Sequence, residues 1–294
     1  MMHFSSDSGR ATHLGSTDMK VSRIGTGTNR WALGENDEDV FQVYKALMDK
    51  DVNFFDTAEI YTGGRSERLL GACIRRDSRL PVLASKYRPS DSRRTEKDFT
   101  EALEESLRRL GVSTLDLYYV HMPPSTQSIE ELMDYMAEAK DAGKIRVVGV
   151  SNFDAEQMRE AAARLEEHGL KLAANQVEYS LLNREPETNG VLETCKSLDV
   201  SLVAYRPLGR GQLASAEKIG GSKTDSILET LIQSIAGNHG GSASQVVLRW
   251  LLHRSELVIP IPGATKVDHA LENARALDWV MSKAEFDELD EASS

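Results

Sequence analysis

The sequence predicts a single α/β domain, a (β/α)8 TIM barrel with a short N-terminal hairpin before the first barrel strand. Eight short β-rich runs alternate with longer segments whose apolar residues recur at helical spacing. The chain has 294 residues, enough for one such barrel of roughly 250. A doubly wound open sheet is the less favoured alternative, because no Gly-x-Gly-x-x-Gly follows the first strand and because closure removes both sheet edges.

The predicted strands are runs of β-branched and other apolar residues, bounded by polar residues, Gly or Pro. They are expected at 21–27, 53–56, 82–86, 115–121, 145–150, 173–177, 202–205 and 258–261. The predicted helices carry an apolar stripe, and Gly111, Gly143 and Gly169 stand where three of them should end. They are expected at 37–49, 65–76, 95–110, 129–142, 155–167, 186–197, 244–253, 267–277 and 282–292.

Two segments fall outside this alternation. Residues 209–226 are rich in Gly and Ser and are predicted to form a long loop that acts as a lid. Residues 1–13 are expected to be a flexible N-terminal segment, which leaves 14–294 as the barrel domain.

Charge and composition exclude several classes of function. The chain has 35 Lys and Arg against 46 Asp and Glu, a net charge of -11 without any basic block, which argues against nucleic-acid binding. No apolar run approaches the roughly 18 residues of a membrane span, and the N-terminus lacks an export signal, so a cytoplasmic location is expected. The two cysteines, Cys73 and Cys195, indicate neither a metal site nor a disulfide framework. The oligomeric state is left open.

Four titratable residues follow neighbouring predicted strands at the barrel end where catalysis occurs in this fold. Asp56 ends the second strand, Tyr61 lies in the loop behind it, Lys86 ends the third strand, and His121 ends the fourth. Each of them alone has an ordinary structural explanation, such as a helix cap or a buried core residue. Their common position at one rim indicates an active site.

The chemistry of these four residues is consistent with proton transfer to a carbonyl oxygen. A phenol with a pKa of about 10 is a weak acid at neutral pH, and the Lys86 ammonium is expected to lower that pKa by at most roughly three pH units before desolvation opposes it. Asp56 would keep Lys86 protonated, and a neutral His121 would orient the substrate oxygen. No side chain donates hydride, so a nicotinamide cofactor is implied.

The chain resembles the aldo-keto reductase family from about Leu14 to Leu277. The motifs that carry the resemblance are FDTAEIY, LASK, YVHMP, GVSNF, NQVEYSLLNR, AYRPLGRG and IPIPGA, which occur in the family's order. The resemblance implies that Asp56, Tyr61, Lys86 and His121 form the catalytic tetrad, with Tyr61 as the general acid. It also implies NADPH as the cofactor, with NADH possible, and a small carbonyl compound as the substrate.

By the same resemblance, a set of residues after the strands and near the C-terminus would bind the cofactor. These are Gly27, Thr28, Ser151, Asn152, Gln176, Tyr205, Arg206, Pro207, Leu208, Gly209, Gly211, Ile261, Pro262, Gly263, Ala264, Thr265, Lys266, Glu272 and Asn273. Ser151, Asn152 and Gln176 would hold the nicotinamide carboxamide, Tyr205 would stack on the ring, and Lys266 would contact a 2'-phosphate.

Two positions depart from the family pattern. His269 stands where relatives that prefer the phosphorylated cofactor often carry Arg, and Arg206 replaces a more frequent Ser. We hypothesise that Arg206 lies beside the pyrophosphate and compensates for His269; an unchanged NADPH affinity in Arg206→Ser would refute this.

The substrate pocket is expected to be mostly apolar, with Trp31, Met122 and Tyr179 as contacts and with Pro123 beside them. Three cations, Arg88, Arg184 and Arg206, could reach a carboxylate or phosphate on the substrate. Two other functions are weighed. The chain could be an NADP-binding regulatory subunit with little turnover, similar to potassium-channel β-subunits, or a barrel aldolase with Lys86 as a Schiff-base nucleophile.

Overall fold

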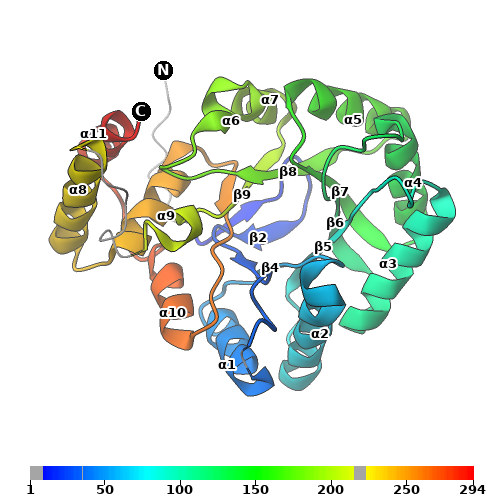
Figure 1. Ribbon diagram of the computed structural model, residues 1–294, viewed down its shortest axis with the longest axis horizontal. Helices are drawn as coiled ribbons and strands as arrows, with labels where there is room; N and C mark the ends of the chain where they lie inside the picture. The colour runs from blue at the N-terminus through cyan, green and yellow to red at the C-terminus, as the bar shows by residue number, and fades with distance from the viewer. Residues whose placement is uncertain (1–8, 35, 215–222) are drawn as a thin grey trace.

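The computed structural model describes residues 9–34, 36–214 and 223–294, and in them eight parallel strands form one sheet in chain order. These strands are β3 (Thr26–Gly27), β4 (Phe54–Asp56), β5 (Val82–Tyr87), β6 (Leu115–Val120), β7 (Ile145–Ser151), β8 (Leu172–Glu178), β9 (Ser201–Tyr205) and β10 (Val258–Pro260). The sheet closes between its first and last strands, because the N–H groups of Gly25 and Gly27 donate to the carbonyls of Pro260 and Pro262 at 3.0 and 3.3 Å. The predicted barrel is therefore confirmed, and its strands form the centre of the ring in Figure 1.

The N-terminal hairpin consists of β1 (Ala11–His13) and β2 (Lys20–Ser22), which pair antiparallel. It lies across the N-terminal ends of the barrel strands, where the Gly15 N–H donates to Ser201 Oγ at 2.7 Å and where Leu14 is fully buried. Two boundary predictions are corrected here. Residues 11–13 are a strand rather than part of a flexible segment, and the strand predicted at 21–27 is divided into β2 and β3, because Ser22 Oγ donates to the Ile24 carbonyl and interrupts the extended run. Residues 1–8 lie outside the described part.

The helices surround the barrel (Figure 1). They are α1 (Asp37–Met48), α2 (Arg65–Asp77), α3 (Glu96–Leu110), α4 (Ile129–Asp141), α5 (Ala155–Glu167), α6 (Glu185–Thr188), α7 (Val191–Leu198), α8 (Lys223–His239), α9 (Ala243–Arg254), α10 (Val267–Arg275) and α11 (Lys283–Ala292). Side-chain caps fix several of their starts; Thr95, Ser128, Asp154 and Ser282 each form a capping box.

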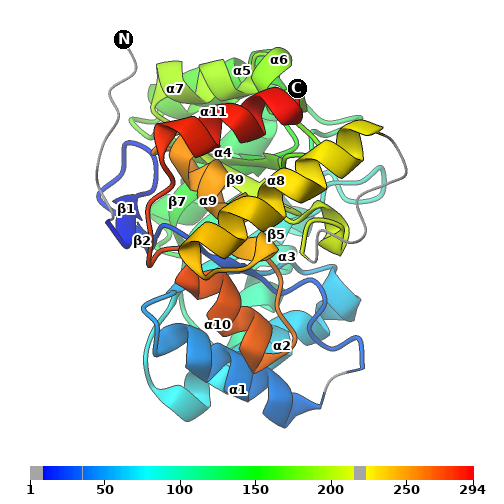
Figure 2. The same cartoon turned by 90° about the vertical axis from the view of Figure 1, so that its left-hand side faces the viewer.

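Two helical predictions need correction. The helix predicted at 186–197 is divided into α6 and α7, because Gly190 adopts a left-handed conformation with φ 85°. The helix α8 was not predicted, although Leu228, Ile232 and Ile235 repeat at helical spacing and are buried. It packs with α11 and α9 outside the ring (Figure 2), and its first residues belong to the segment predicted as a lid. Residues 209–214 of that segment are described and contain the short helix η2 (Gly209–Gly211), whereas residues 215–222 lie outside the described part.

The core has two layers, which follow from the alternation of side chains along each strand. Outward-facing residues such as Tyr87 and Tyr118 pack under the helices, and inward-facing residues such as Ala84, Leu117 and Tyr119 fill the barrel. This alternation also aims Lys86 into the barrel, one residue before Tyr87. No helix in the described ranges has the length and apolar character that a membrane crossing requires.

Candidate active site

The four candidate catalytic residues meet at the C-terminal ends of β4, β5 and β6. Asp56 ends β4 and Lys86 is the second-last residue of β5. His121 follows β6 directly, and its N–H donates to the carbonyl of Tyr87 on β5 at 2.8 Å. The parallel register of these three strands is what brings side chains far apart in the sequence to one place.

A buried ion pair lies at the centre of the site. Lys86 Nζ donates to Asp56 Oδ1 at 2.5 Å and to the Thr57 carbonyl at 2.6 Å, and both side chains are at most 2% exposed. Gln176 Nε2 from β8 donates to the other carboxylate oxygen, Asp56 Oδ2, at 2.7 Å. Desolvation lowers the pKa of Lys86, but Asp56 and the nearby Tyr61 hold it above the ordinary value, so Lys86 is an ammonium at neutral pH.

Tyr61 lies over this ion pair at the start of the short helix η1 (Tyr61–Gly64). Lys86 Nζ is 5.0 Å from the centroid of its ring, and the ring meets His121 edge to face with centroids 5.9 Å apart. Burial raises the pKa of Tyr61, and Lys86 opposes this through its charge and a hydrogen bond without reversing it. The expectation that Lys86 produces a net lowering is therefore wrong for this arrangement: desolvation outweighs the cation, and Tyr61 holds its proton at neutral pH.

The turn that carries Tyr61 has a strained backbone. Thr62, Gly63 and Gly64 all have left-handed conformations, with φ values of 48°, 62° and 76°. A left-handed conformation is uncommon for a β-branched residue such as Thr62 and costs of order 1–3 kcal/mol, so surrounding contacts must maintain it.

Glu59 and Arg93 supply one such contact, which the sequence did not reveal. Both Arg93 Nη atoms donate to the Glu59 carboxylate, at 2.9 and 3.0 Å, and the Arg88 N–H donates to Glu59 Oε1 at 2.7 Å. Glu59 thereby joins the turn of Tyr61 to the loop that follows Lys86. Its place inside the FDTAEIY motif was the available signal, whereas nothing local to Arg93 in the sequence points to this role.

His121 is neutral at physiological pH. Burial lowers its pKa to about 3, and the charges of Lys86 and Arg88 act in the same direction. Its Nδ1 is buried and has no hydrogen-bond partner among the residues that the structure describes.

We expect this histidine to make the protein less stable in acid. Between pH 6.5 and pH 3 the unfolded chain binds a proton at His121 that the folded protein does not, so the free energy of unfolding falls as the pH is lowered. On going from pH 7.5 to 5.0, the wild type should lose about 2 kcal/mol more than His121→Gln. Urea denaturation of both proteins at the two pH values measures this; a constant difference between them would contradict it.

The residues predicted to hold the nicotinamide are connected by hydrogen bonds to one another and to the candidate catalytic residues. Ser151 Oγ donates to the Gln176 carbonyl at 2.9 Å, and Asn152 Nδ2 donates to the His121 carbonyl at 3.1 Å. The Tyr205 hydroxyl donates to Asn152 Oδ1 at 3.0 Å, and Asn152 has a φ of 61°, which Asn tolerates. Ser151 and Gln176 are buried, whereas Asn152 is exposed and Tyr205 is half-buried.

The remaining predicted cofactor residues lie around β3, β9, β10 and α10. Gly27 bridges to Gly263 across the closure of the barrel, and buried Thr28 donates its hydroxyl to the Asp56 carbonyl at 3.0 Å. The predicted residues of the loops after β9 and β10 are Pro207, Leu208, Gly209, Gly211, Ile261, Pro262, Ala264 and Thr265. Lys266 is exposed and precedes α10, whose N-terminus has no side-chain cap; Glu272 is half-buried and Asn273 is buried on that helix.

Arg206 is exposed at the end of β9 with a φ of 51°. Its Nη1 atom pairs with Glu178 Oε2 from β8 at 2.8 Å, so a carboxylate already neutralises part of its charge. Compensation for His269 by Arg206 stays a prediction.

Of the three predicted substrate contacts, only Met122 is partly accessible to solvent. Met122 follows His121 and is half-buried. Trp31 is fully buried and donates its Nε1–H to the Ala264 carbonyl at 2.9 Å. Tyr179 is also fully buried, with its hydroxyl donating to Glu187 Oε1 at 2.7 Å. The assignment of Trp31 and Tyr179 as substrate contacts stays a prediction.

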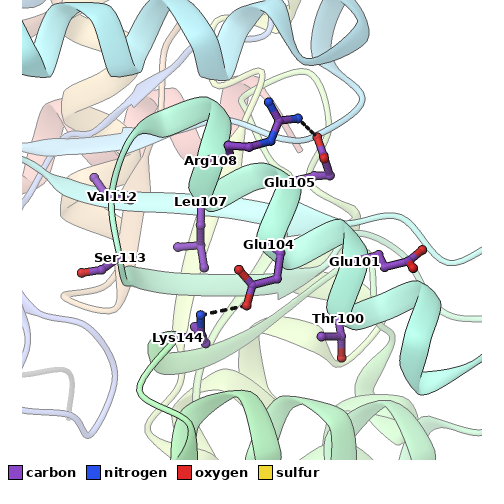
Figure 3. Close-up of a pocket in the computed structure, with 9 residues that line it drawn as sticks. All are labelled: Thr100, Glu101, Glu104, Glu105, Leu107, Arg108, Val112, Ser113 and Lys144. Carbon is purple, nitrogen blue, oxygen red and sulfur yellow. Dashed lines mark hydrogen bonds and ion pairs between the residues drawn. The ribbon is translucent and has the colours of Figure 1, made fainter.

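A hollow of about 730 Å³ lies away from this site, on the outer surface of α3 (Figure 3). Its acidic residues are paired in part, since Lys144 Nζ lies 2.8 Å from Glu104 Oε1 and Arg108 bonds to Glu105. It shares no residue with the candidate active site.

Comparison with known proteins gives a consistent picture. The model of the Aldo/keto reductase family matches residues 23–294. The Schizosaccharomyces pombe protein named aldo-keto reductase yakc, NADP(+), is 32% identical over 290 residues, which cover 88% of this chain and 84% of that protein. Among solved structures, the thermostable aldo-keto reductase Tm1743 in complex with the inhibitor epalrestat superposes with a TM-score of 0.84 at 33% identity, covering 96% of this chain and 99% of the other. An aldo/keto reductase from Klebsiella pneumoniae, in complex with NADP and acetate, gives 0.81 at 32% identity, covering 96% and 95%.

Proposed function

Because this chain belongs to the aldo/keto reductase family, we propose that it reduces aldehydes or ketones to alcohols with NADPH as the hydride donor and Tyr61 as the proton donor. The observation that carries the proposal is the buried Lys86–Asp56 ion pair beneath the ring of Tyr61, with a neutral His121 beside it. A general acid must hold its proton until charge develops on the substrate oxygen, and the raised pKa of Tyr61 satisfies that condition.

The described residues fit a dinucleotide phosphate. The first N–H groups of α10 have no side-chain acceptor, and a helix N-terminus without a cap is suited to bind an anion. Lys266 stands at that end, while Tyr205, Asn152 and Ser151 offer a ring and polar groups beside the catalytic residues. When bound, NADPH supplies the hydride.

Each catalytic residue then has one task. Tyr61 donates its proton to the developing alkoxide, and Lys86, kept charged by Asp56, stabilises the phenolate that remains. His121 is neutral and is available to hydrogen-bond the substrate oxygen. The raised pKa of Lys86 argues against a Schiff-base aldolase, because an amine must lose its proton before it attacks a carbonyl.

The test of the proposed function is NADPH consumption with benzaldehyde as a neutral aromatic substrate. We expect turnover, and we expect it to depend on Tyr61. Binding of NADPH without turnover of a broad panel of aldehydes and ketones would contradict the proposal and favour the regulatory subunit. The cytoplasmic location stays a prediction.

We expect Lys266→Gln to weaken NADPH binding by about 10- to 100-fold, because a hydrogen bond to a charged group contributes about 1.5–3 kcal/mol. NADH affinity should change little, since NADH lacks the 2'-phosphate. Fluorescence titration of both cofactors measures the two dissociation constants, and Lys171→Gln at the opposite end of the barrel is the matched control. Equal weakening for both cofactors would show that Lys266 does not read the phosphate.

A further inference from the structure

Arg88 occupies a defined place at the mouth of the barrel, two residues after Lys86. Side chains alternate along a strand, so Lys86 points into the barrel, Tyr87 packs outward under α3, and Arg88 returns to the side of Lys86. In the parallel pairing of β5 with β6, Lys86 lies opposite Tyr119 and Tyr87 lies opposite Val120. Continued by one residue, this register places Arg88 beside His121. The bond from the His121 N–H to the Tyr87 carbonyl confirms that pairing.

The backbone of Arg88 is held on both sides. Its N–H donates to Glu59 Oε1 at 2.7 Å, and its carbonyl accepts from Arg93 Nη1 at 3.3 Å. The same Glu59 belongs to the turn that carries Tyr61. These bonds give the backbone of Arg88 a defined position relative to Tyr61 and His121, so its side chain starts from a fixed point at the site.

Arg88 differs from the other two cations considered as anion ligands. Arg184 pairs with Glu187 and with Asp290, each at 2.7 Å, and Arg206 pairs with Glu178 at 2.8 Å. The side chain of Arg88, in contrast, has no ion pair or hydrogen bond with any residue in 9–34, 36–214 or 223–294, although the residue is half-buried. Its charge nevertheless reaches the site, since it helps to lower the pKa of His121.

We infer that Arg88 recognises an oxyanion, a carboxylate or a phosphate, on the carbonyl substrate. This inference rests on the proposed reductase function and adds the substrate class to it. The planar guanidinium matches the two oxygens of either anion, and a half-buried cation without a protein carboxylate gains most from such a partner. Arg88 lies farther along the chain direction of β5 than Lys86, so the oxyanion binds nearer the mouth of the barrel than the reacting carbonyl.

The experiment compares kcat/KM for charged and neutral substrates of matched shape. One arm uses 4-carboxybenzaldehyde against methyl 4-formylbenzoate, and the other uses glyceraldehyde 3-phosphate against glyceraldehyde. We expect the wild type to prefer the charged member of at least one arm, and that arm identifies the anion. Arg88→Gln should lower kcat/KM for that member by about 10- to 100-fold and leave the neutral member within about twofold. For the charged substrate, the kcat/KM of Arg88→Lys should lie between those of the wild type and Arg88→Gln.

Arg94→Gln is the matched control, because Arg94 is exposed in the same loop. In this variant the ratio of kcat/KM for the charged substrate to that for the neutral one should stay as in the wild type in both arms. The inference is overturned if the wild type prefers neither charged substrate or if Arg88→Gln keeps the preference. A second measurement separates this outcome from failure of the proposed function. Calorimetry of 4-(hydroxymethyl)benzoate and its amide should show a preference for the anion that depends on Arg88 even without turnover. An equal affinity for both compounds would refute the inference, whereas absent turnover of every aldehyde would refute the reductase function.

Discussion

Replacing Tyr61 with Phe is expected to lower kcat by about 10²- to 10⁴-fold, the range that a general acid contributes. The substitution removes only the transferable proton, because the ring that lies over Lys86 and against His121 remains. NADPH should therefore bind with unchanged affinity. Steady-state kinetics with benzaldehyde and a fluorescence titration of NADPH measure the two effects separately.

Tyr135→Phe provides the control for this prediction. Tyr135 lies on α4 and its ring packs at a tilt against Phe99 outside the barrel, so the loss of its hydroxyl should leave kcat unchanged. A Tyr61→Phe protein whose kcat stays within about threefold of the wild type would mean that the proton comes from another group.

Replacing Lys86 with Met should abolish most of the activity and also destabilise the protein by about 3–5 kcal/mol. The large effect on stability arises because the substitution leaves Asp56 without its cation while the carboxylate remains buried. The effect on activity arises because no ammonium then stabilises the Tyr61 phenolate. Urea denaturation gives the first quantity, and NADPH consumption gives the second.

The double variant Lys86→Met with Asp56→Asn separates the two effects. Removing both charges should restore most of the lost free energy of unfolding, since no unpaired buried charge remains, while activity stays low. If the double variant were as unstable as Lys86→Met, the ion pair would not be the source of the destabilisation. If it recovered activity, Lys86 would have no role in catalysis.

The local sequence was sufficient to predict the barrel and the position of the tetrad. Asp56, Lys86 and His121 each follow a buried run, and the parallel strands of a closed barrel bring such ends together whatever the details of packing. The alternation of side chains along β5 aims Lys86 into the barrel. The boundaries of the hairpin and of α6 were wrong because they depend on Ser22 and Gly190, whose backbone geometry is set by a few local contacts.

The tertiary structure decided the electrostatics and the accessibility of the site. The pKa of Tyr61 shifts upward because the desolvation caused by burial outweighs the charge of Lys86. The extent of burial depends on neighbours from many strands. Trp31 and Tyr179 have the residue types of a substrate pocket, and their full burial, with bonds to the distant Ala264 and to Glu187, is a result of the fold. The ion pairs of Arg184 with Asp290 and of Arg206 with Glu178 could not be predicted from the sequence, because the fold brings those carboxylates within reach. Of the three arginines Arg88, Arg184 and Arg206, only Arg88 has a side chain with no carboxylate partner among the described residues.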